Sequence, residues 1–186
     1  MMHKLFDLLE SLVSRPRKPR CLIVLAGGQT GVDQAAHRAA MANGLLCAGW
    51  CPPGRESEAG RITPEFPLTP TPEDRSRLAP DVPRSQRTEW NVRDADATLI
   101  LDVSSPPTDP GTAFATRAAG ILGRPLLIVD PRDQKNIPAV MAWLNKHEIR
   151  VLNIAGPSEN TSPGISQTAF AFLSELFSCQ KDSSRQ

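Results

Sequence analysis

The stretch "CLIVLAGGQTGVDQAA", residues 21–36, decides the fold class. Its first six residues form a continuous apolar run, which is typical of a strand that is covered on both faces. Glycines then lead into an alanine-rich segment, for which we predict a helix from about Gly31 to Asn43, ended by Gly44. A buried strand that turns through glycine directly into a helix favours an α/β fold.

The same alternation continues to the end of the chain. The patterns predict further strands at 45–50, 97–103, 125–130 and 150–156, and further helices at 84–95, 111–123, 137–149 and 165–177. This succession predicts a doubly wound α/β domain, a mostly parallel sheet of about five or more strands with helices on both faces. We expect the strand order 2-1-3-4-5, which places a ligand crevice at the carboxyl edge between the first and third strands.

Three segments divide the chain. Residues 1–20 contain leucines at helical spacing followed by "SRPRKPR", and predict an amphipathic helix with a basic linker. This helix could pack on the domain or on a neighbouring subunit; membrane binding is the minority interpretation, because the charge follows the helix rather than lining it. Residues 21–180 form the ligand-binding domain, and residues 181–186 are expected to be a flexible tail.

Composition excludes several classes of function. The net charge of +1 gives no reason to expect nucleic acid or a membrane surface as partner, and aromatic residues make up only 5%. The four cysteines and three histidines are scattered, so we expect reduced thiols and no zinc site. With neither an apolar membrane span nor a signal peptide in the sequence, we expect a cytoplasmic protein.

Two loops are candidates for binding an anion. Backbone N–H groups at a helix N-terminus attract phosphate, and glycines let the backbone approach it closely. The first loop, residues 27–31, adds the donors Gln29 and Thr30, and the second offers Ser104, Gly111 and Thr112. Neither loop spells the dinucleotide fingerprint or the Walker motif.

Each loop also has an interpretation that needs no ligand. Thr30 and Asp33 have the spacing of a capping box, which would tie the Asp33 carboxylate to backbone N–H groups and favour its charged form. The prolines of the second loop could simply stiffen a turn.

A proline-rich segment, residues 51–83, leaves the second strand at the same edge of the sheet. It is too long for an ordinary connection, so it is either functional or disordered. If it folds over the crevice as a lid, Arg55 and Arg61 could reach a phosphate or carboxylate; otherwise they are solvated loop charges.

Six ordered blocks carry a family resemblance: "GGQTGVDQAA", "GWCPPGR", "PLTPTP", "RTEWNVRDADATLIL", "GRPLLIV" and "LNIAGPSENTSPGI". Over about residues 22–176 they resemble the molybdenum cofactor carrier family, the circularly permuted YpsA-like branch of the SLOG superfamily. The resemblance implies a Rossmann-like fold that forms a homo-oligomer. It also implies a crevice for molybdenum cofactor of the molybdopterin type or a nucleotide-like ligand, with molybdenum enzymes or their insertion factors as partners.

The resemblance also implies site residues. The family's glycine loop falls on residues 27–31, and its second anion loop falls on Gly111 and Thr112. Two further blocks add Arg87, Glu89, Trp90, Asn91, Ser158, Glu159, Asn160 and Gly164, although Trp90 could equally be a core residue. The related phosphoribohydrolases have a glutamate where this chain has Ala115, so the acid and base for glycosidic cleavage are in doubt.

The leading hypothesis is therefore a non-catalytic carrier that holds a phosphate-bearing ligand at two glycine-containing helix N-termini. Phosphate, sulfate or molybdate would occupy the same site, because N–H donors recognise charge and size. The alternatives are a phosphoribohydrolase-like enzyme that uses Asp33, Glu89 or Asp102, and a sensor of a nucleotide-related ligand. The candidate ligand-binding residues are Gly27, Gly28, Gln29, Thr30, Gly31, Asp33, Arg55, Arg61, Ser104, Gly111 and Thr112; no catalytic or metal-binding residue is predicted.

Overall fold

The computed structural model describes residues 22–104 and 106–183. The main strands are β1 (Ile23–Leu25), β2 (Leu46–Cys51), β5 (Leu68–Pro70), β6 (Ala97–Leu101), β7 (Leu126–Val129) and β8 (Val151–Ala155), and β3 (Glu56–Ser57) and β4 (Gly60–Arg61) form a small hairpin. The helices are α2 (Val32–Ala42), α3 (Ser85–Asp94), α4 (Pro110–Ile121), α5 (Ile137–Lys146) and α6 (Ile165–Ser183), with short 3₁₀ turns η1 (Pro53–Arg55) and η2 (Gln134–Asn136). The predicted N-terminal helix and linker lie outside the described residues.

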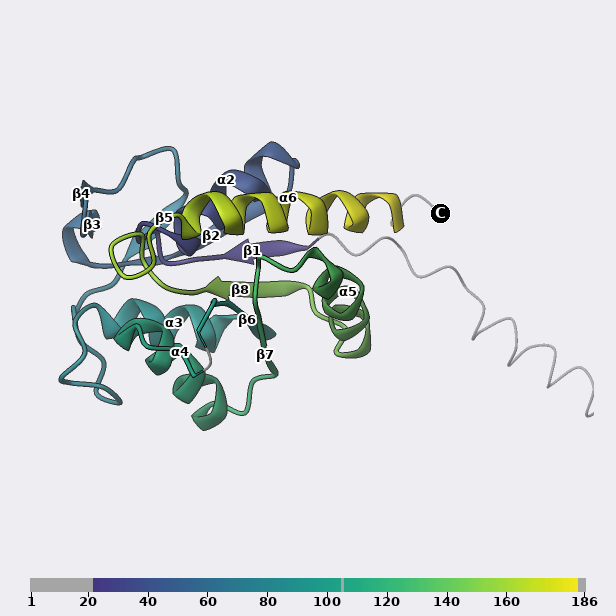
Figure 1. Ribbon diagram of the computed structural model, residues 1–186. Coiled ribbons are helices and arrows are strands. Elements are labelled where there is room, and N and C mark those ends of the chain that lie inside the picture. Colours follow the sequence, from purple (N-terminus) through teal and green to yellow (C-terminus); the bar gives the residue numbers. More distant parts are fainter. Residues whose placement is uncertain (1–21, 105, 184–186) are drawn as a thin grey trace, which may run out of the picture.

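The sheet is parallel throughout and has the order β5-β2-β1-β8-β6-β7. The α/β class and the layers are as predicted, but the expected strand order is wrong, because the last strand, β8, lies between β1 and β6 (Figure 1). The alternation of strands and helices does not determine the order: the wholly apolar β7 is at the edge, with Ile128 38% exposed, whereas the central strand β8 contains a polar residue. That residue, Asn153, is buried centrally and donates a hydrogen bond to Thr98 at 3.2 Å.

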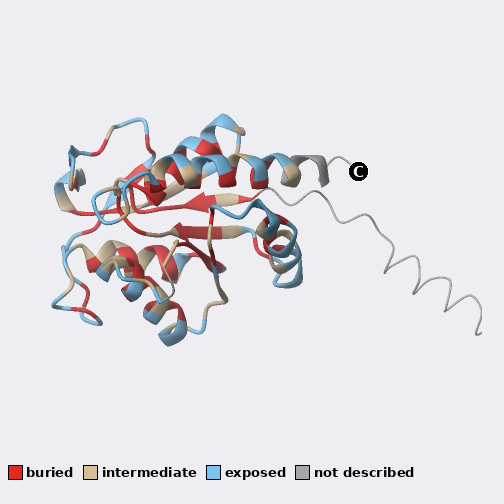
Figure 2. Ribbon diagram, in the orientation of Figure 1, coloured by how far each residue is buried: buried red, intermediate tan, exposed pale blue. Residues whose placement is uncertain are grey.

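Helices cover both faces of the sheet, and each face has its own buried cluster. The larger cluster joins the sheet to α2, α5 and α6, and includes Val24, Leu99 and Phe172. The smaller cluster joins the other face to α3 and α4, and includes Ile100 and Phe114. Figure 2 shows the burial concentrated along the strands and on the inner sides of these helices.

The proline-rich segment is more ordered than a plain loop. It supplies the β3–β4 hairpin and the edge strand β5, which pairs with β2 and which no sequence pattern predicted. A separate small cluster, Cys51, Ile62, Phe66 and Leu68, holds this segment against the sheet. At the other end of the chain, α6 continues to Ser183, so the start of the expected tail is helical; the last three residues lie outside the described part.

Candidate functional site

Three loops meet at the carboxyl edge of the sheet, where β1, β8 and β6 end. These strands are neighbours in the order β1-β8-β6, so the segments 26–31, 156–164 and 102–109 lie next to one another. Helices α2, α6 and α4 begin directly after them (Figure 1). The corrected strand order therefore brings a third helix N-terminus, that of α6, between the two that the sequence predicted.

The glycines of the first loop make room for other parts of the chain. Gly28 and Gly31 have φ values of +81° and +80°, which residues with a Cβ rarely adopt. A Cβ on Gly31 would overlap the carbonyl oxygen of Pro157, and a Cβ on Gly27 would overlap the Arg87 guanidinium. All three glycines are buried, so protein packing explains them, and ligand contact at the loop stays a prediction.

An ion pair between helices α3 and α2 stabilises the first loop. Arg87 of α3 donates a hydrogen bond to Asp33 of α2 at 2.7 Å, and the two side chains are only 13% and 3% exposed. The same carboxylate oxygen accepts a hydrogen bond from the Gln29 N–H at 3.2 Å. Burial raises the pKa of Asp33 above its ordinary value, although Arg87 and the Gln29 N–H oppose the shift.

Two expectations about Asp33 therefore need correction. The residue before α2 is Gly31 and no side chain caps this helix, so Thr30 and Asp33 do not form the capping box. The hydrogen bonds were expected to dominate the carboxyl group and favour its charged form, but burial has the larger effect on its pKa. Asp33 connects two helices, which local spacing cannot reveal.

A carboxylate from the β3–β4 hairpin lies on the first loop. Glu58 accepts hydrogen bonds from the Thr30 hydroxyl and, at 3.1 Å, from the Asn160 N–H. Its own N–H donates to the Gln29 side chain at 2.9 Å, and the Glu159 N–H donates to Thr30 at 3.3 Å. Donors from two loops thus hold one negatively charged group at the carboxyl edge.

At the other two helices that begin at this edge, α4 and α6, an acidic side chain accepts hydrogen bonds from N–H groups at the helix start. Asp109 caps α4 by accepting hydrogen bonds from the N–H and the hydroxyl of Thr112, at 2.8 and 3.0 Å. Glu159 accepts hydrogen bonds from the N–H groups of Gly164 and Ser166 at the start of α6. Hydrogen bonding from the Ser166 side chain, and then from the Gly164 N–H, lowers the pKa of the Glu159 carboxyl group. Such caps satisfy donors that an anion would otherwise use.

The two arginines predicted to reach a ligand differ in their surroundings. Arg55 donates hydrogen bonds to the carbonyl groups of Leu68, Thr63 and Phe66, at 2.7 to 2.9 Å, and so fixes the proline-rich segment internally. Arg61 is exposed on β4. These contacts do not show whether either arginine binds a ligand, so that role stays a prediction for both residues.

The second loop contains a buried carboxylate with spare hydrogen-bonding capacity. Asp102 follows β6 and is 4% exposed; one of its oxygens accepts from the Ser104 N–H at 2.8 Å. Its other oxygen has no partner within the described part of the chain, and the same holds for Nε of Arg87. Buried polar atoms normally have partners. Both atoms are closed off from solvent, so a ligand or water would reach them only if neighbouring groups moved.

A histidine lies beneath the first loop. His37 of α2 is fully buried, contacts the Ala26 carbonyl oxygen through Nε2 at 3.2 Å and stacks on Phe66. Burial lowers its pKa from 6.5 to about 4. The imidazole is therefore neutral near pH 7.

Of the residues in the "RTEWN" block, one contacts the first loop, and the others contact β2 or the proline-rich segment. Arg87 reaches the first loop, whereas Glu89 accepts a hydrogen bond from the Ser76 hydroxyl. Asn91 joins α3 to β2 through both backbone groups of Trp50, each at 2.9 Å. Trp90 is half-buried against Trp50, and is thus neither a fully buried core residue nor part of the loops.

Ala115, which occupies the position of the hydrolase glutamate, is fully buried in the cluster between α4 and the sheet. Glu58 is the residue that sequence reasoning missed. It lies in a segment for which the sequence predicted ligand contacts through arginines alone, and nothing near it in the sequence indicates a contact with Thr30.

Comparisons with known proteins agree with the overall fold. The model of the circularly permuted YpsA SLOG family matches residues 24–177. The chain belongs to this family. A solved structure with 34% sequence identity, described as a putative molybdenum carrier protein from Syntrophus aciditrophicus SB, superposes with a TM-score of 0.75. The match covers 87% of this chain and 97% of that one. No curated protein sequence matches the chain.

Two kinds of feature are missing from the described part of the chain. Among residues 22–104 and 106–183, no group of three or more His, Cys, Asp or Glu side chains could hold a metal ion. No helix in the same ranges is long and apolar enough to cross a membrane.

Proposed function

We propose that this protein is a carrier for a small phosphate-bearing molecule, and that the phosphate binds where Glu58 now lies. The observation that carries the proposal is the Glu58 carboxylate, which donors from two separate loops, Thr30 and Asn160, hold in place. Donors arranged around one carboxylate also suit a phosphate oxygen, because both groups are acceptors only. Displacing Glu58 would require the β3–β4 hairpin to move away from the loop.

The hydrogen bonding at the starts of the three helices supports the same position for the phosphate. Acidic side chains cap α4 and α6, whereas no side chain caps α2. Asp33 lies in the first turn of α2, and the Val32 N–H donates to the Pro157 carbonyl at 3.3 Å. Because Asp33 is paired with Arg87, its carboxylate only partly offsets the positive end of the helix dipole beside Thr30. Arg87 adds a guanidinium on this side of the edge, and its Nε has no partner among the described residues. The proposal thus places the phosphate at α2 and leaves α4 out, in contrast to the two-helix site predicted from sequence.

Molybdenum cofactor of the molybdopterin type is the ligand we propose, on the strength of the 34%-identical relative described as a molybdenum carrier. Its phosphate would bind at Thr30 and Asn160. The buried Asp102 oxygen would accept a hydrogen bond from a ring N–H, because an ionised carboxylate can only accept. A purine nucleotide also combines a phosphate with ring N–H groups, and remains the alternative ligand. We also propose a cytoplasmic location, a homo-oligomeric state, and molybdenum enzymes as partners.

Hydrolysis is the less favoured function. Asp33 is paired with Arg87, and Glu89 is bonded to Ser76 away from the three loops. Ala115 has no proton to transfer. A general acid or base must reach the reacting atoms. Of the three candidate acids Asp33, Glu89 and Asp102, only Asp102 has a buried oxygen that lacks a partner in the described part of the chain.

The test is ligand capture combined with thermal unfolding. Protein purified from a host that makes molybdenum cofactor should carry a pterin-sized adduct in native mass spectra, and molybdenum by elemental analysis. Inorganic phosphate should stabilise the folded protein by about 2.7 kcal/mol at a hundredfold excess over Kd. Thr30→Val should weaken this effect, and Thr108→Val, an exposed threonine in the second loop, should not. Absence of an adduct and of any phosphate effect at constant ionic strength would contradict the proposal.

A further inference from the structure

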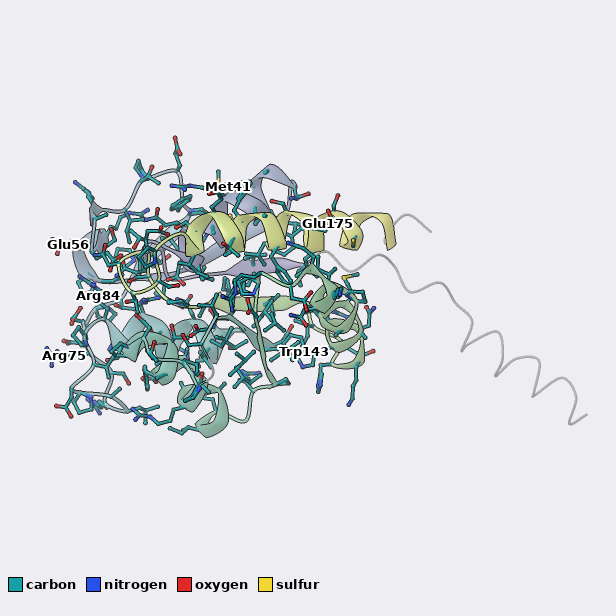
Figure 3. The ribbon with its side chains drawn as sticks, viewed as in Figure 1. Met41, Glu56, Arg75, Arg84, Trp143 and Glu175 are labelled. Carbon is teal, nitrogen blue, oxygen red and sulfur yellow. The ribbon has the colours of Figure 1, made fainter. Side chains whose placement is uncertain are left out.

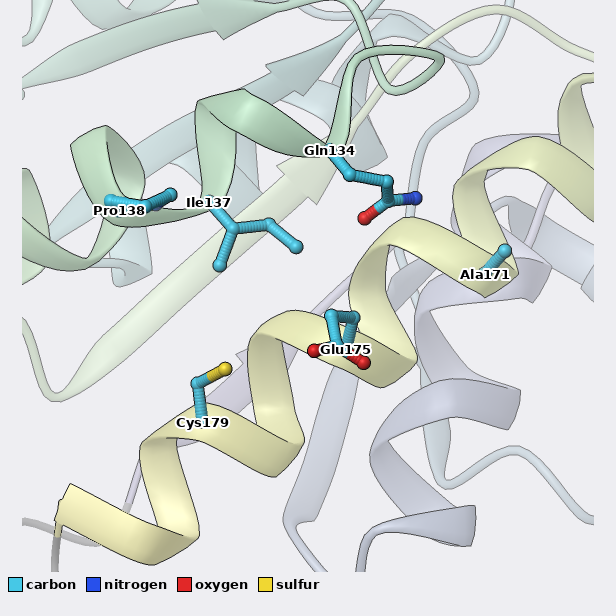
Figure 4. Close-up of a pocket in the computed structure, with 6 residues that line it drawn as sticks. All are labelled: Gln134, Ile137, Pro138, Ala171, Glu175 and Cys179. Atoms are coloured by element: carbon cyan, nitrogen blue, oxygen red, sulfur yellow. The ribbon is translucent and has the colours of Figure 1, made fainter.

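A second surface lies far from the loops, at the other end of α6. Helix α6 and the start of α5 enclose a groove of about 460 Å³. Figure 4 shows Ile137 and Gln134 facing Glu175 and Cys179 across it. The groove is lined by Gln134, Ile137, Pro138, Ala171, Glu175 and Cys179.

The groove is mainly apolar at its base, and Glu175 is the one charged residue among the six that line it. Ile137 is 6% exposed, and Ala171 and Pro138 are exposed on either side. Glu175 projects from α6 at the rim (Figures 3 and 4). An apolar hollow with an acidic rim suits a segment that combines apolar side chains with neighbouring positive charge.

We propose that residues 5–13 of the same chain dock in this groove. Leu5, Leu8, Leu9 and Leu12 follow the i, i+3, i+4, i+7 spacing, which places them on one face of a helix. Asp7 and Glu10 interrupt the spacing and fall on the other face. The segment thus has an apolar face that no other part of the same segment can cover.

The length of the connection suits docking within one chain. Residues 14–21 span at most about 26–29 Å when fully extended. Leu22 and Phe177 of α6 belong to the same buried cluster, against which Cys179 packs. Helix α6 begins at the carboxyl edge of the sheet and runs back over it, so its far end and the start of β1 lie toward the same edge (Figure 1). The groove runs from Cys179 back to Ala171, which along a helix is only about 12 Å.

Charge favours the same occupant. The residues that connect the leucines to β1 include Arg15, Arg17, Lys18 and Arg20. A segment docked between α5 and α6 would bring this basic connection past the exposed Glu175. The hollow on the other side of α6, lined by Ala35, Arg38, Ser166, Gln167 and Phe170, lies toward the start of the helix and carries an arginine instead.

Hydrogen exchange on the full chain tests the proposal. The amides of residues 5–13 should exchange at least about tenfold more slowly than expected for an unprotected peptide. Ala171→Asp, which puts a charge into the groove, should abolish this protection. Gln167→Asp is the matched control, because it makes the same exposed substitution on the same helix outside the groove, and it should keep the protection. The double variant Leu8→Ser/Leu9→Ser should abolish the protection without altering the domain.

The same hydrogen-exchange measurement distinguishes docking of residues 5–13 of the same chain from docking of residues 5–13 of a second copy. Protection that persists when the protein is diluted until light scattering gives the mass of a single chain supports docking within one chain. Protection that grows with concentration together with a doubled mass would show that a second copy supplies the segment, and would overturn the proposal. Rapid exchange of residues 5–13 in the wild-type chain, or equal protection in Ala171→Asp and Gln167→Asp, would overturn it as well.

Discussion

The junctions β1–α2 and β6–α4 look alike in sequence and are built differently. Both pass through glycine and threonine into a helix, and both were predicted to hold an anion. At α4, Asp109 caps the helix from within the same turn. At α2, the support comes from Arg87, Glu58 and Pro157, which are distant in sequence. The difference teaches that two helix starts that look alike in sequence can be stabilised by a local cap in one case and by contacts from distant segments in the other.

The largest expected effect comes from removing the distant support of α2. Arg87→Ala leaves Asp33 buried without its partner, and should lower the free energy of unfolding by about 3–5 kcal/mol near neutral pH. The loss should shrink at acid pH, where Asp33 becomes protonated, and in the double variant with Asp33→Asn. Arg117→Ala on the exposed side of α4 should cost only about 0.5 kcal/mol. Urea unfolding measures each value, and equal losses for the two arginines would contradict the comparison.

A matched pair of glycine substitutions sharpens the comparison. Gly31→Ala puts a Cβ onto the Pro157 carbonyl at a φ of +80°, and should destabilise the fold by about 3 kcal/mol. Gly111→Ala meets only an Asp109 oxygen at 3.2 Å on α4, and should change stability by less than about 1 kcal/mol. Gly28, with φ +81°, should resemble Gly31. If Gly111→Ala is as damaging as Gly31→Ala, the α4 junction is more constrained than its contacts indicate.

A pH titration tests the histidine beneath the first loop. The folded-state pKa of His37 is lowered to about 4, so its stabilising effect is complete above pH 6.5 and is lost as the pH falls from 6.5 toward 4. The shift corresponds to roughly 3 kcal/mol of unfolding free energy at pH 4. His37→Gln should flatten this part of the pH profile relative to the wild type. Parallel profiles for the two proteins would contradict the assignment.

Sequence patterns predicted the elements well and the contacts between them poorly. Apolar runs and helix periodicity located the strands β1, β2, β6, β7 and β8 and the helices α2 to α6, because those patterns are local. The edge strand β5 was missed because three residues within a proline-rich run carry no periodicity. The position of β8 was missed because alternation of elements does not specify which strands become neighbours.

The candidate site shows the same limit. The first loop stays a predicted ligand site: glycines that precede a helix are a local signal, but packing against other parts of the chain already explains them. Asp109 is a local capping signal too, but the assignment of Gly111 and Thr112 to an anion site overlooked it. The contacts of Arg87 and Glu58 depend on side chains separated by 54 and 28 residues, and no short pattern encodes them.

Phosphate affinity of two hairpin variants tests the central claim most directly. Glu58→Gln removes the carboxylate that occupies the proposed phosphate position, and Glu56→Gln removes the same charge from an exposed position of the same hairpin. Isothermal titration with inorganic phosphate should show that Glu58→Gln binds about tenfold more tightly than the wild type, because a charge-assisted hydrogen bond no longer competes. Glu56→Gln should bind like the wild type. Equal affinities in both variants, or weaker binding in Glu58→Gln, would contradict the assignment of the phosphate to the Thr30 side of the edge.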